Sequence, residues 1–328
     1  MQAVWFDRFG AAADSLICGE LPMPVAGEDE VLVRLETTGV NPSDVKKRAG
    51  AFPDLLDTGL VIPHSDGAGV IEAVGPGVDP ARIGERVFVY EAQYGRRFGT
   101  AAGYVALDSR RAPRLPDAAG FEVGACIGIP IMTAHRCVFA DGPVTDRVIV
   151  VTGGAGRVGY YAIQWAKWGG AVVIATASNS EDEAACRTVG ADHVVNHRRA
   201  GWSADVLAAT GGERVDRLVE VEFGANLLEA LDFLRTGATI ATYSSTAVPE
   251  PALPFRRMMF MDLTLRMVIV YAMPEEAKQQ AIADTQHLLE EGYLQHRVAD
   301  KLPLSDMVRA HEIVERGEVR GCVVVSTR

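Results

Sequence analysis

The run from Val148 to Gly159 limits what this chain can fold into more than any other segment. Val148 to Val151 are four β-branched residues in a row, which predicts a strand buried on both faces. Gly154, Gly156 and Gly159 then match G-x-G-x-x-G, and helical periodicity begins at Tyr160. In the order strand, glycine turn, helix, this spacing binds the pyrophosphate of a dinucleotide, because the backbone can approach closely and the helix N-terminus faces the anion.

The following segments extend this unit into a βαβαβ pattern. Strands are expected at 171–176 and 192–195, with a helix at 182–189 between them. Further strands at 217–221, 238–243 and 263–270, and a helix at 227–235, continue the alternation. A glycine-rich loop without a ligand is the alternative, but the complete pattern favours a doubly wound parallel sheet that binds a nucleotide.

The first 120 residues or so have a different character. Strands are expected at 31–36, 70–74, 86–90 and 103–107, and the closely spaced glycines and prolines predict a compact, partly open antiparallel barrel. A short helix is expected after Ser43, with Ser43 as its N-cap. The remaining expected elements are a helix-rich stretch at 118–140 broken at Pro130, helices at 275–291 and 305–316, and a strand at 322–325.

Length and composition exclude several classes of protein. A chain of 328 residues is long enough for two domains, and its net charge of −11 argues against a nucleic-acid protein held by bulk electrostatics. No apolar run predicts a membrane span or signal peptide. The five cysteines form no C-x-x-C pair, which is typical of buried thiols in a reducing cytoplasm, so we expect a cytoplasmic protein.

Several further segments, spread over nearly the whole chain, form a combination far more specific than the glycine turn alone. They are Gly39-Val40-Asn41-Pro42, Ser65 to Gly75, Gly84 to Phe88, Ile127 to Pro130 with Thr133-Ala134, and Val195 to Arg198. With the glycine turn, they resemble the medium-chain dehydrogenases/reductases, and within these the zinc-free quinone oxidoreductase family typified by zeta-crystallin. The resemblance implies a Rossmann NADPH-binding domain (123–264) inserted in a β-rich GroES-like catalytic domain (1–122 and 265–328). It also implies a homodimer or homotetramer.

The positions of metal ligands differ from those of the zinc alcohol dehydrogenases in the same superfamily. Asn41 stands where those enzymes have cysteine, and Ser65-Asp66 stand where they have a His-Glu pair. His64 is adjacent but lacks a cysteine partner, and the segment from Tyr90 to Ala112 has none of the four cysteines of their structural zinc lobe. Since zinc needs convergent His, Cys or carboxylate ligands, we expect a metal-free enzyme.

The corner after the second Rossmann strand predicts the cofactor. Ser178 and Asn179 are neutral, with no acidic residue before Glu181 to repel a 2′-phosphate, and His197-Arg198 follow the third strand. One departure is Asp182, near which many bacterial relatives carry a lysine. We therefore expect NADPH. By resemblance, the full set of cofactor-binding residues is Thr133, Gly154, Ala155, Gly156, Arg157, Val158, Ser178, Asn179, His197, Arg198, Gly224, Tyr243, Ser244, Ser245, Thr246, Val268, Ile269 and Val270.

The resemblance implies hydride transfer from NADPH to a quinone. Asn41, Lys46 and Tyr94 are the candidate donors near the acceptor, although relatives have tyrosine where Lys46 stands, and Lys46-Lys47-Arg48 equally fits a solvated helix face. An NADPH-dependent reductase of enones or enoyl compounds is the first alternative, and it would need a placed acid to protonate carbon. A nucleotide- or RNA-binding protein without turnover is the second, although the acidic net charge argues against nucleic acid as a partner.

Overall fold

The computed structural model describes residues 1–328, and these form two compact units. Unit 1 comprises Met1–Ile129 with Ile282–Arg328, and unit 2 comprises Pro130–Ala281. From the family resemblance, the domain boundaries are expected at 122/123 and 264/265. The second lies later in the structure because the strand at Thr264–Met267 still pairs within the sheet of unit 2. No helix is both long enough and apolar enough to cross a lipid bilayer.

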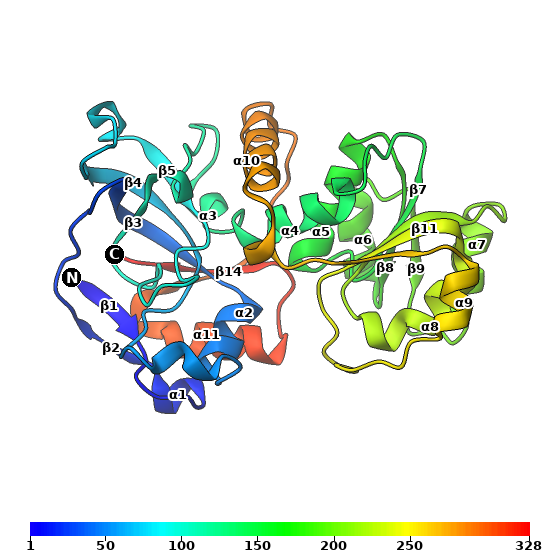
Figure 1. Cartoon of the computed structure of the whole chain (residues 1–328), viewed down its shortest axis with the longest axis horizontal. Coiled ribbons are helices and arrows are strands. Elements are labelled where there is room, and N and C mark those ends of the chain that lie inside the picture. The colour runs from blue at the N-terminus through cyan, green and yellow to red at the C-terminus, as the bar shows by residue number, and fades with distance from the viewer. The chain divides into compact units, whose positions relative to one another are not determined.

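Unit 2 is built on a six-stranded, fully parallel sheet (Figure 1). Its strand order is β12-β11-β10-β7-β8-β9, the order of a doubly wound dinucleotide-binding fold. The strands are β7 (Val148–Val151), β8 (Val172–Ala177), β9 (His193–Asn196), β10 (Val215–Glu220), β11 (Leu234–Thr242) and β12 (Thr264–Met267). The helices are α4 (Ile129–Phe139), α5 (Arg157–Trp168), α6 (Ser180–Thr188), α7 (Trp202–Ala209), α8 (Phe223–Phe233) and α9 (Phe255–Phe260).

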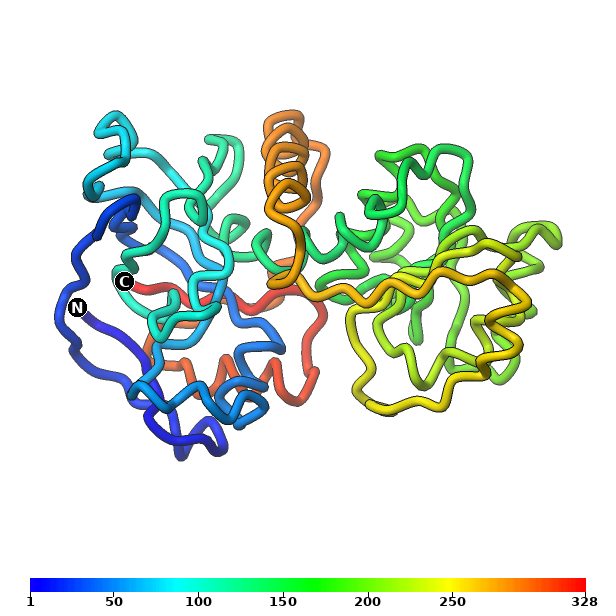
Figure 2. Tube along the Cα trace, viewed as in Figure 1, coloured from blue at the N-terminus to red at the C-terminus, as the bar shows by residue number.

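Both faces of this sheet are covered. Val148 and Val150 pack in one core cluster with side chains of α7 and α8, such as Trp202 and Leu227. Ile149 and Val151 alternate with them along β7 and so point to the other face of the sheet. These two side chains are also fully buried. In the Cα trace of Figure 2, the green and yellow part of the chain follows this alternation of strands and helices.

Unit 1 contains a mixed sheet in the order β13-β14-β3-β4-β5, with β6 also paired to β3. The eleven-residue β3 organises it, because this strand pairs antiparallel with β14, β4 and β6 along its length. The strands are β3 (Glu30–Val40), β4 (Asp66–Val74), β5 (Arg86–Val89), β6 (Tyr104–Asp108), β13 (Val298–Pro303) and β14 (Cys322–Ser326), with a separate hairpin of β1 (Gln2–Trp5) and β2 (Ile17–Glu20). The helices are α1 (Ala12–Ser15), α2 (Pro42–Arg48), α3 (Phe121–Gly124) and α11 (Met307–Arg316), and α10 (Glu275–Glu290) spans the boundary at 281/282.

Several expectations about local structure were wrong. The helical stretch at 118–140 is interrupted at 125–128, between α3 and α4, and Pro130 lies in the first turn of α4, where proline is tolerated. The helix expected at 227–235 is α8, which ends at Phe233 because β11 begins at Leu234. The N-cap of α2 is Asn41 instead of Ser43, since Pro42 already occupies the first helical position, where its missing N–H costs nothing. The strand expected at 263–270 ends at Met267, because its partner β11 ends at the paired Thr242, and a 3₁₀ turn begins at Val270. The predicted fold class, a doubly wound parallel sheet together with a β-rich domain, is confirmed.

Candidate active site

The glycine turn after β7 has the shape that a dinucleotide pyrophosphate requires. A Cβ atom on Gly159 would lie 2.3 Å from the carbonyl oxygen of Gly153, and one on Gly154 would lie 2.8 Å from Cys186 Sγ. Gly156 is the N-cap of α5, with Arg157 and Val158 in the first turn and Ala155 just before it. A larger side chain does not fit at Gly154 or Gly159. The turn therefore stays open for a phosphate to approach the N-terminus of α5 closely.

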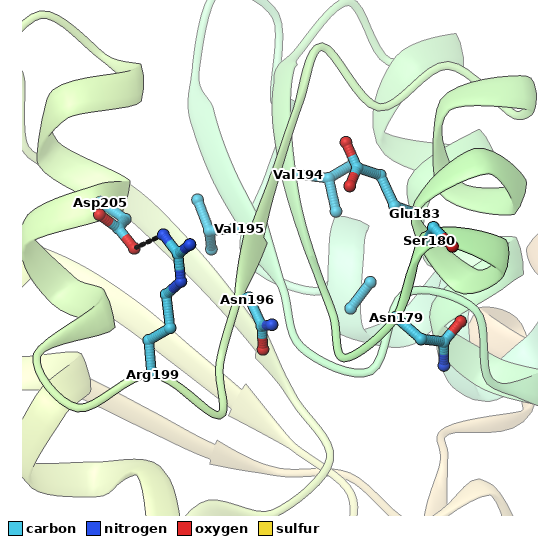
Figure 3. Close-up of a pocket in the computed structure, with 9 residues that line it drawn as sticks. Asn179, Ser180, Glu183, Val194, Val195, Asn196, Arg199 and Asp205 are labelled. Atoms are coloured by element: carbon cyan, nitrogen blue, oxygen red, sulfur yellow. Dashed lines mark ion pairs between the residues drawn. The ribbon is translucent and has the colours of Figure 1, made fainter.

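A pocket of about 360 Å³ lies at the ends of β8 and β9, beside the predicted 2′-phosphate corner (Figure 3). Of the predicted residues Ser178, Asn179, His197 and Arg198, only Asn179 lines it. The Asn179 amide is largely used as the N-cap of α6. Its Oδ1 accepts the backbone N–H of Asp182 at 2.9 Å, and its Nδ2 donates to the Asp182 carboxylate at 2.9 Å. This cap holds the acidic side chain of Asp182, which is only 5% exposed.

Charged residues that the sequence analysis did not select also line this pocket. Arg199 faces Asp205 at 3.9 Å in Figure 3, and Glu183 pairs with Arg187 at 2.9 Å. Arg198 is exposed, has no carboxylate partner, and its backbone N–H donates to Asn196 Oδ1 at 3.0 Å. Of the predicted pair His197-Arg198, the arginine therefore offers the cation that is available to a phosphate.

A second pocket of unit 2, of about 480 Å³, brings two predicted segments together. Tyr243, Ser244 and Ser245 after β11 line it, as do Val268 and Ile269 after β12. Burial raises the pKa of the Tyr243 hydroxyl well above its usual range, so this group is a neutral hydrogen-bonding group at physiological pH. Two other predicted residues are buried, Thr133 on α4 and Val270 in its 3₁₀ turn. The hydroxyl oxygen of Thr246 lies 3.3 Å from that of Ser244.

Gly224 has a structural role beside this pocket. Its N–H donates to Ser245 Oγ at 2.9 Å, and a Cβ atom there would lie 2.3 Å from the carbonyl oxygen of Val248. Gly224 therefore allows the start of α8 to pack against the loop that follows β11.

Glu220, at the end of β10, is a buried residue that the sequence analysis missed. Its Oε1 accepts from the Thr152 hydroxyl and the Asn226 amide, both at 2.9 Å, and from the N–H of Glu222 at 2.5 Å. Burial raises the pKa of this carboxyl group, and the bonded donors oppose that shift. Glu220 thereby fixes the end of β7 against the turn into α8. The sequence feature that could have identified Glu220 is a charged residue at the end of an apolar strand pattern.

In unit 1, Asn41 belongs to a buried hydrogen-bond network around Asp66. Asn41 Nδ2 donates to Asp66 Oδ2 at 2.8 Å, and the N–H of Ile129 donates to both Asp66 oxygens at 3.0 and 2.9 Å. Gly128 makes this possible, since a Cβ atom there would lie 2.1 Å from Asp66 Oδ1. Burial raises the pKa of Asp66 well above its usual range, against the effect of the hydrogen bond from Asn41. The Asn41 side chain is therefore held in one orientation.

The two other predicted acceptor residues lie at the surface of unit 1. Lys46 is exposed in the last turn of α2, and Tyr94 is 51% exposed. Lys47 is the buried lysine of α2: it is 5% exposed, and its Nζ donates to the carbonyl oxygen of Gln93 at 3.1 Å. Burial lowers its pKa, opposed by the charges of Asp44, Asp66 and Glu91. No pattern in the sequence distinguishes these two adjacent lysines.

His64 takes part in a buried polar chain within unit 1. Its Nδ1 lies 2.9 Å from Thr38 Oγ1, and its Nε2 lies 2.9 Å from Nε2 of His311 on α11. Burial lowers the pKa of His64 to about 3, so the ring is neutral at physiological pH. Both ring nitrogens already have partners, which leaves neither for a metal.

These residues do not fit a zinc ion. The Asn41 amide and the Asp66 carboxylate are bonded to one another, and His64 is bonded to Thr38 and His311. Nowhere do three or more His, Cys, Asp or Glu side chains converge as metal ligands would. These residues therefore offer no site for a catalytic zinc ion.

The fold and the glycine turn define a two-domain dinucleotide-binding protein, and comparison with known proteins agrees. Residues 27–117 match the family model described as alcohol dehydrogenase GroES-like domain, and residues 158–286 match that described as zinc-binding dehydrogenase. Human quinone oxidoreductase is 30% identical over 321 residues, which cover 97% of this chain and 94% of the human protein.

Solved structures are similar over the whole chain. A mycobacterial protein complexed with NADPH is 28% identical, with a TM-score of 0.87 over 99% of this chain and 100% of that one. A structure described as an NAD-dependent alcohol dehydrogenase is also 28% identical, with a TM-score of 0.88 and 99% of each chain covered. The chain belongs to the quinone oxidoreductase family of the medium-chain dehydrogenases/reductases.

Proposed function

We propose that this protein is an NADPH-dependent quinone oxidoreductase that works without a metal ion. Hydride from the nicotinamide of NADPH, together with one proton from solvent, would convert a quinone to its hydroquinone and leave NADP⁺. The main support comes from Asn41 and Asp66. Their side chains are hydrogen-bonded to each other, and no cluster of zinc ligands forms around them.

The chemistry of the acceptor explains why such a site favours a quinone. A simple ketone develops a localised alkoxide, which zinc stabilises in metal-dependent alcohol dehydrogenases. A quinone becomes aromatic on reduction and spreads the charge over two oxygens, so positioning and one or two hydrogen bonds suffice. We propose Asn41, Lys46 and Tyr94 as residues on the acceptor side.

The cofactor would bind along unit 2. The glycine turn would hold the pyrophosphate, Ser178 and Arg198 would face the 2′-phosphate, and the pocket beside Tyr243 would hold the nicotinamide end. NADPH also agrees with the mycobacterial relative solved with that cofactor. An Arg198 contact with the phosphate is charge-assisted, and such contacts contribute about 1.5–3 kcal/mol, or roughly one to two decades of affinity.

Titration of tryptophan fluorescence with NADPH and NADH tests this assignment. NADPH should bind at least about tenfold more tightly, and Arg198→Met should remove most of that preference while leaving NADH affinity unchanged. Arg256→Met is a matched control, because Arg256 is another exposed arginine of unit 2. Equal affinities, or a preference for NADH, would refute the proposed phosphate site.

Zinc content is a separate test of the metal-free proposal. Elemental analysis should find no stoichiometric zinc, and quinone reduction should survive a chelator. About one zinc per chain, with activity lost on chelation, would overturn it.

A further inference from the structure

A pocket of unit 1 directly after α2 has no part in the assignments above. It measures about 410 Å³, within the usual range for small-molecule sites, and its walls are the segments 51–55 and 95–97 with Thr58. Phe52 contributes an aromatic wall, since its side chain remains 45% exposed, and Leu55 adds apolar surface. An aromatic molecule of one or two rings would find a flat partner here.

Two arginines give this pocket a positive charge. Arg97 Nη1 donates to the carbonyl oxygen of Thr58 at 2.6 Å, and Arg96 Nη2 donates to that of Ala106. A guanidinium has five N–H donors, so each of these side chains keeps donors for a ligand. The charges of Glu30 and Asp108 act on Arg96 and oppose the lowering of its pKa by burial, so Arg97 is the main cation of the pocket. Asp54 is the one carboxylate that lines the pocket, and it is exposed to solvent.

The backbone is shaped to hold Arg97 in place. Gly59 has a φ of +114°, and a Cβ atom there would lie 2.6 Å from Arg97 Nη1. The guanidinium carbon also lies 4.9 Å from the centre of the Phe98 ring. A glycine, a carbonyl and an aromatic ring thus fix one guanidinium at the wall of an aromatic-lined pocket.

We propose that this pocket binds the anionic group of an aromatic acceptor, so that the preferred substrates are quinones carrying a sulfonate or carboxylate. This proposal rests on the proposed quinone reductase function and adds the charge of its substrate. A guanidinium pairs with two oxygens of such an anion at once, whereas Phe52 stacks on its ring. The pocket also adjoins residues proposed for the acceptor side. The Ala51 N–H donates to the carbonyl oxygen of Lys46 at 3.0 Å, and Tyr94 immediately precedes Gly95.

Paired substrates test the proposal. NADPH oxidation is measured with 1,4-naphthoquinone and with its 2-sulfonate. Arg97→Met should lower kcat/KM for the sulfonate at least about tenfold and for the neutral quinone less than about twofold, because a charge-assisted contact is lost only in the first case. Arg96→Met should act in the same direction, and Asp54→Asn should raise kcat/KM for the sulfonate. Arg309→Met, which removes an exposed arginine of α11 in the same unit, should change neither rate.

A redox-inert ligand separates this proposal from the function on which it rests. Naphthalene-2-sulfonate should bind the wild-type protein in calorimetry and should bind both arginine variants about tenfold more weakly. Equal effects of Arg97→Met on the two quinones, or unchanged binding of naphthalene-2-sulfonate by variants that unfold at the wild-type temperature, would overturn the anion pocket. Arginine-dependent binding of naphthalene-2-sulfonate without reduction of any quinone would uphold the pocket and overturn the proposed function.

Discussion

At the scale of single residues, Lys46 and Lys47 are adjacent on α2 but their ammonium groups have different surroundings. Lys47 is buried and donates to Gln93, whereas Lys46 is exposed. A buried lysine in a hydrogen-bond network serves mainly to hold its segment. The exposed ammonium of Lys46 remains able to reach a substrate, so the proposed donor role belongs to Lys46.

We predict that Lys46→Met lowers kcat/KM for a small quinone by about one to two decades and leaves NADPH affinity nearly unchanged. This loss corresponds to roughly 1.4–2.7 kcal/mol, the size expected for one charged donor. Lys301→Met is the control: Lys301 is exposed, its ion pair with Glu122 lies at the surface, and its removal should leave the rate unchanged. An unaltered rate in Lys46→Met would mean that Lys46 is only a solvated side chain of α2.

His64 makes a prediction about pH and stability. The free side chain titrates near pH 6.5, whereas burial in the fold lowers the pKa to about 3. Between these values the unfolded chain binds a proton that the folded chain does not, so the free energy of unfolding falls as the pH is lowered. For His64 alone, the loss between pH 7 and pH 5 is about 2 kcal/mol.

The variant His64→Asn isolates this contribution. Asparagine tolerates the left-handed backbone of this position, where φ is +77°, and does not titrate. Urea unfolding at several pH values should show a shallower decline for the variant than for the wild type below pH 6.5. Parallel curves would show that His64 is protonated in the folded protein. Asp66, whose pKa is raised, acts in the opposite sense in both proteins.

At the scale of elements, the glycine turn between β7 and α5 is the feature that fixes both fold and cofactor. We predict that Gly159→Ala destabilises the protein by about 1–3 kcal/mol, because its Cβ would collide with the backbone carbonyl of Gly153. Gly103→Ala is the matched control, since the nearest atom to a Cβ there is 3.8 Å away. Thermal unfolding of the two variants should differ by several degrees, and equal unfolding temperatures would contradict the packing described.

Elements with a strong pattern were predictable from the sequence. The β7 strand has the predicted bounds, and α10 and β14 differ from prediction by a residue at one end, because their periodicity is clear. The strand β13 and helix α9 were not predicted. Val298–Pro303 has no apolar alternation, and Phe255–Phe260 is too short to show a helical face. Pairing with β14, instead of local preference, makes Val298–Pro303 a strand.

At the scale of the whole molecule, sequence motifs were enough to predict the fold and the family. They did not predict the buried hydrogen-bond networks of the candidate site. The buried pair His64 and His311 is separated by 247 residues, and Asn41 meets Asp66 from 25 residues away. Such contacts depend on how β4, α2 and α11 pack in unit 1, which no local spacing encodes. The positive charge of the pocket beside Phe52 likewise emerges only when the segments 51–55 and 95–97 are brought together.

Single-turnover oxidation of NADPH by 1,4-naphthoquinone is the most direct test of the central claim, that hydride passes from NADPH to a quinone without a metal. Chelator-treated protein, mixed with NADPH and then with the quinone in a stopped-flow instrument, should oxidise NADPH rapidly. The rate should fall several-fold when the transferred hydrogen is deuterium. A simple ketone should oxidise little or no NADPH. No oxidation by the quinone while NADPH remains bound would contradict the account, and faster reduction of an α,β-unsaturated ketone than of any quinone would identify an enone reductase instead.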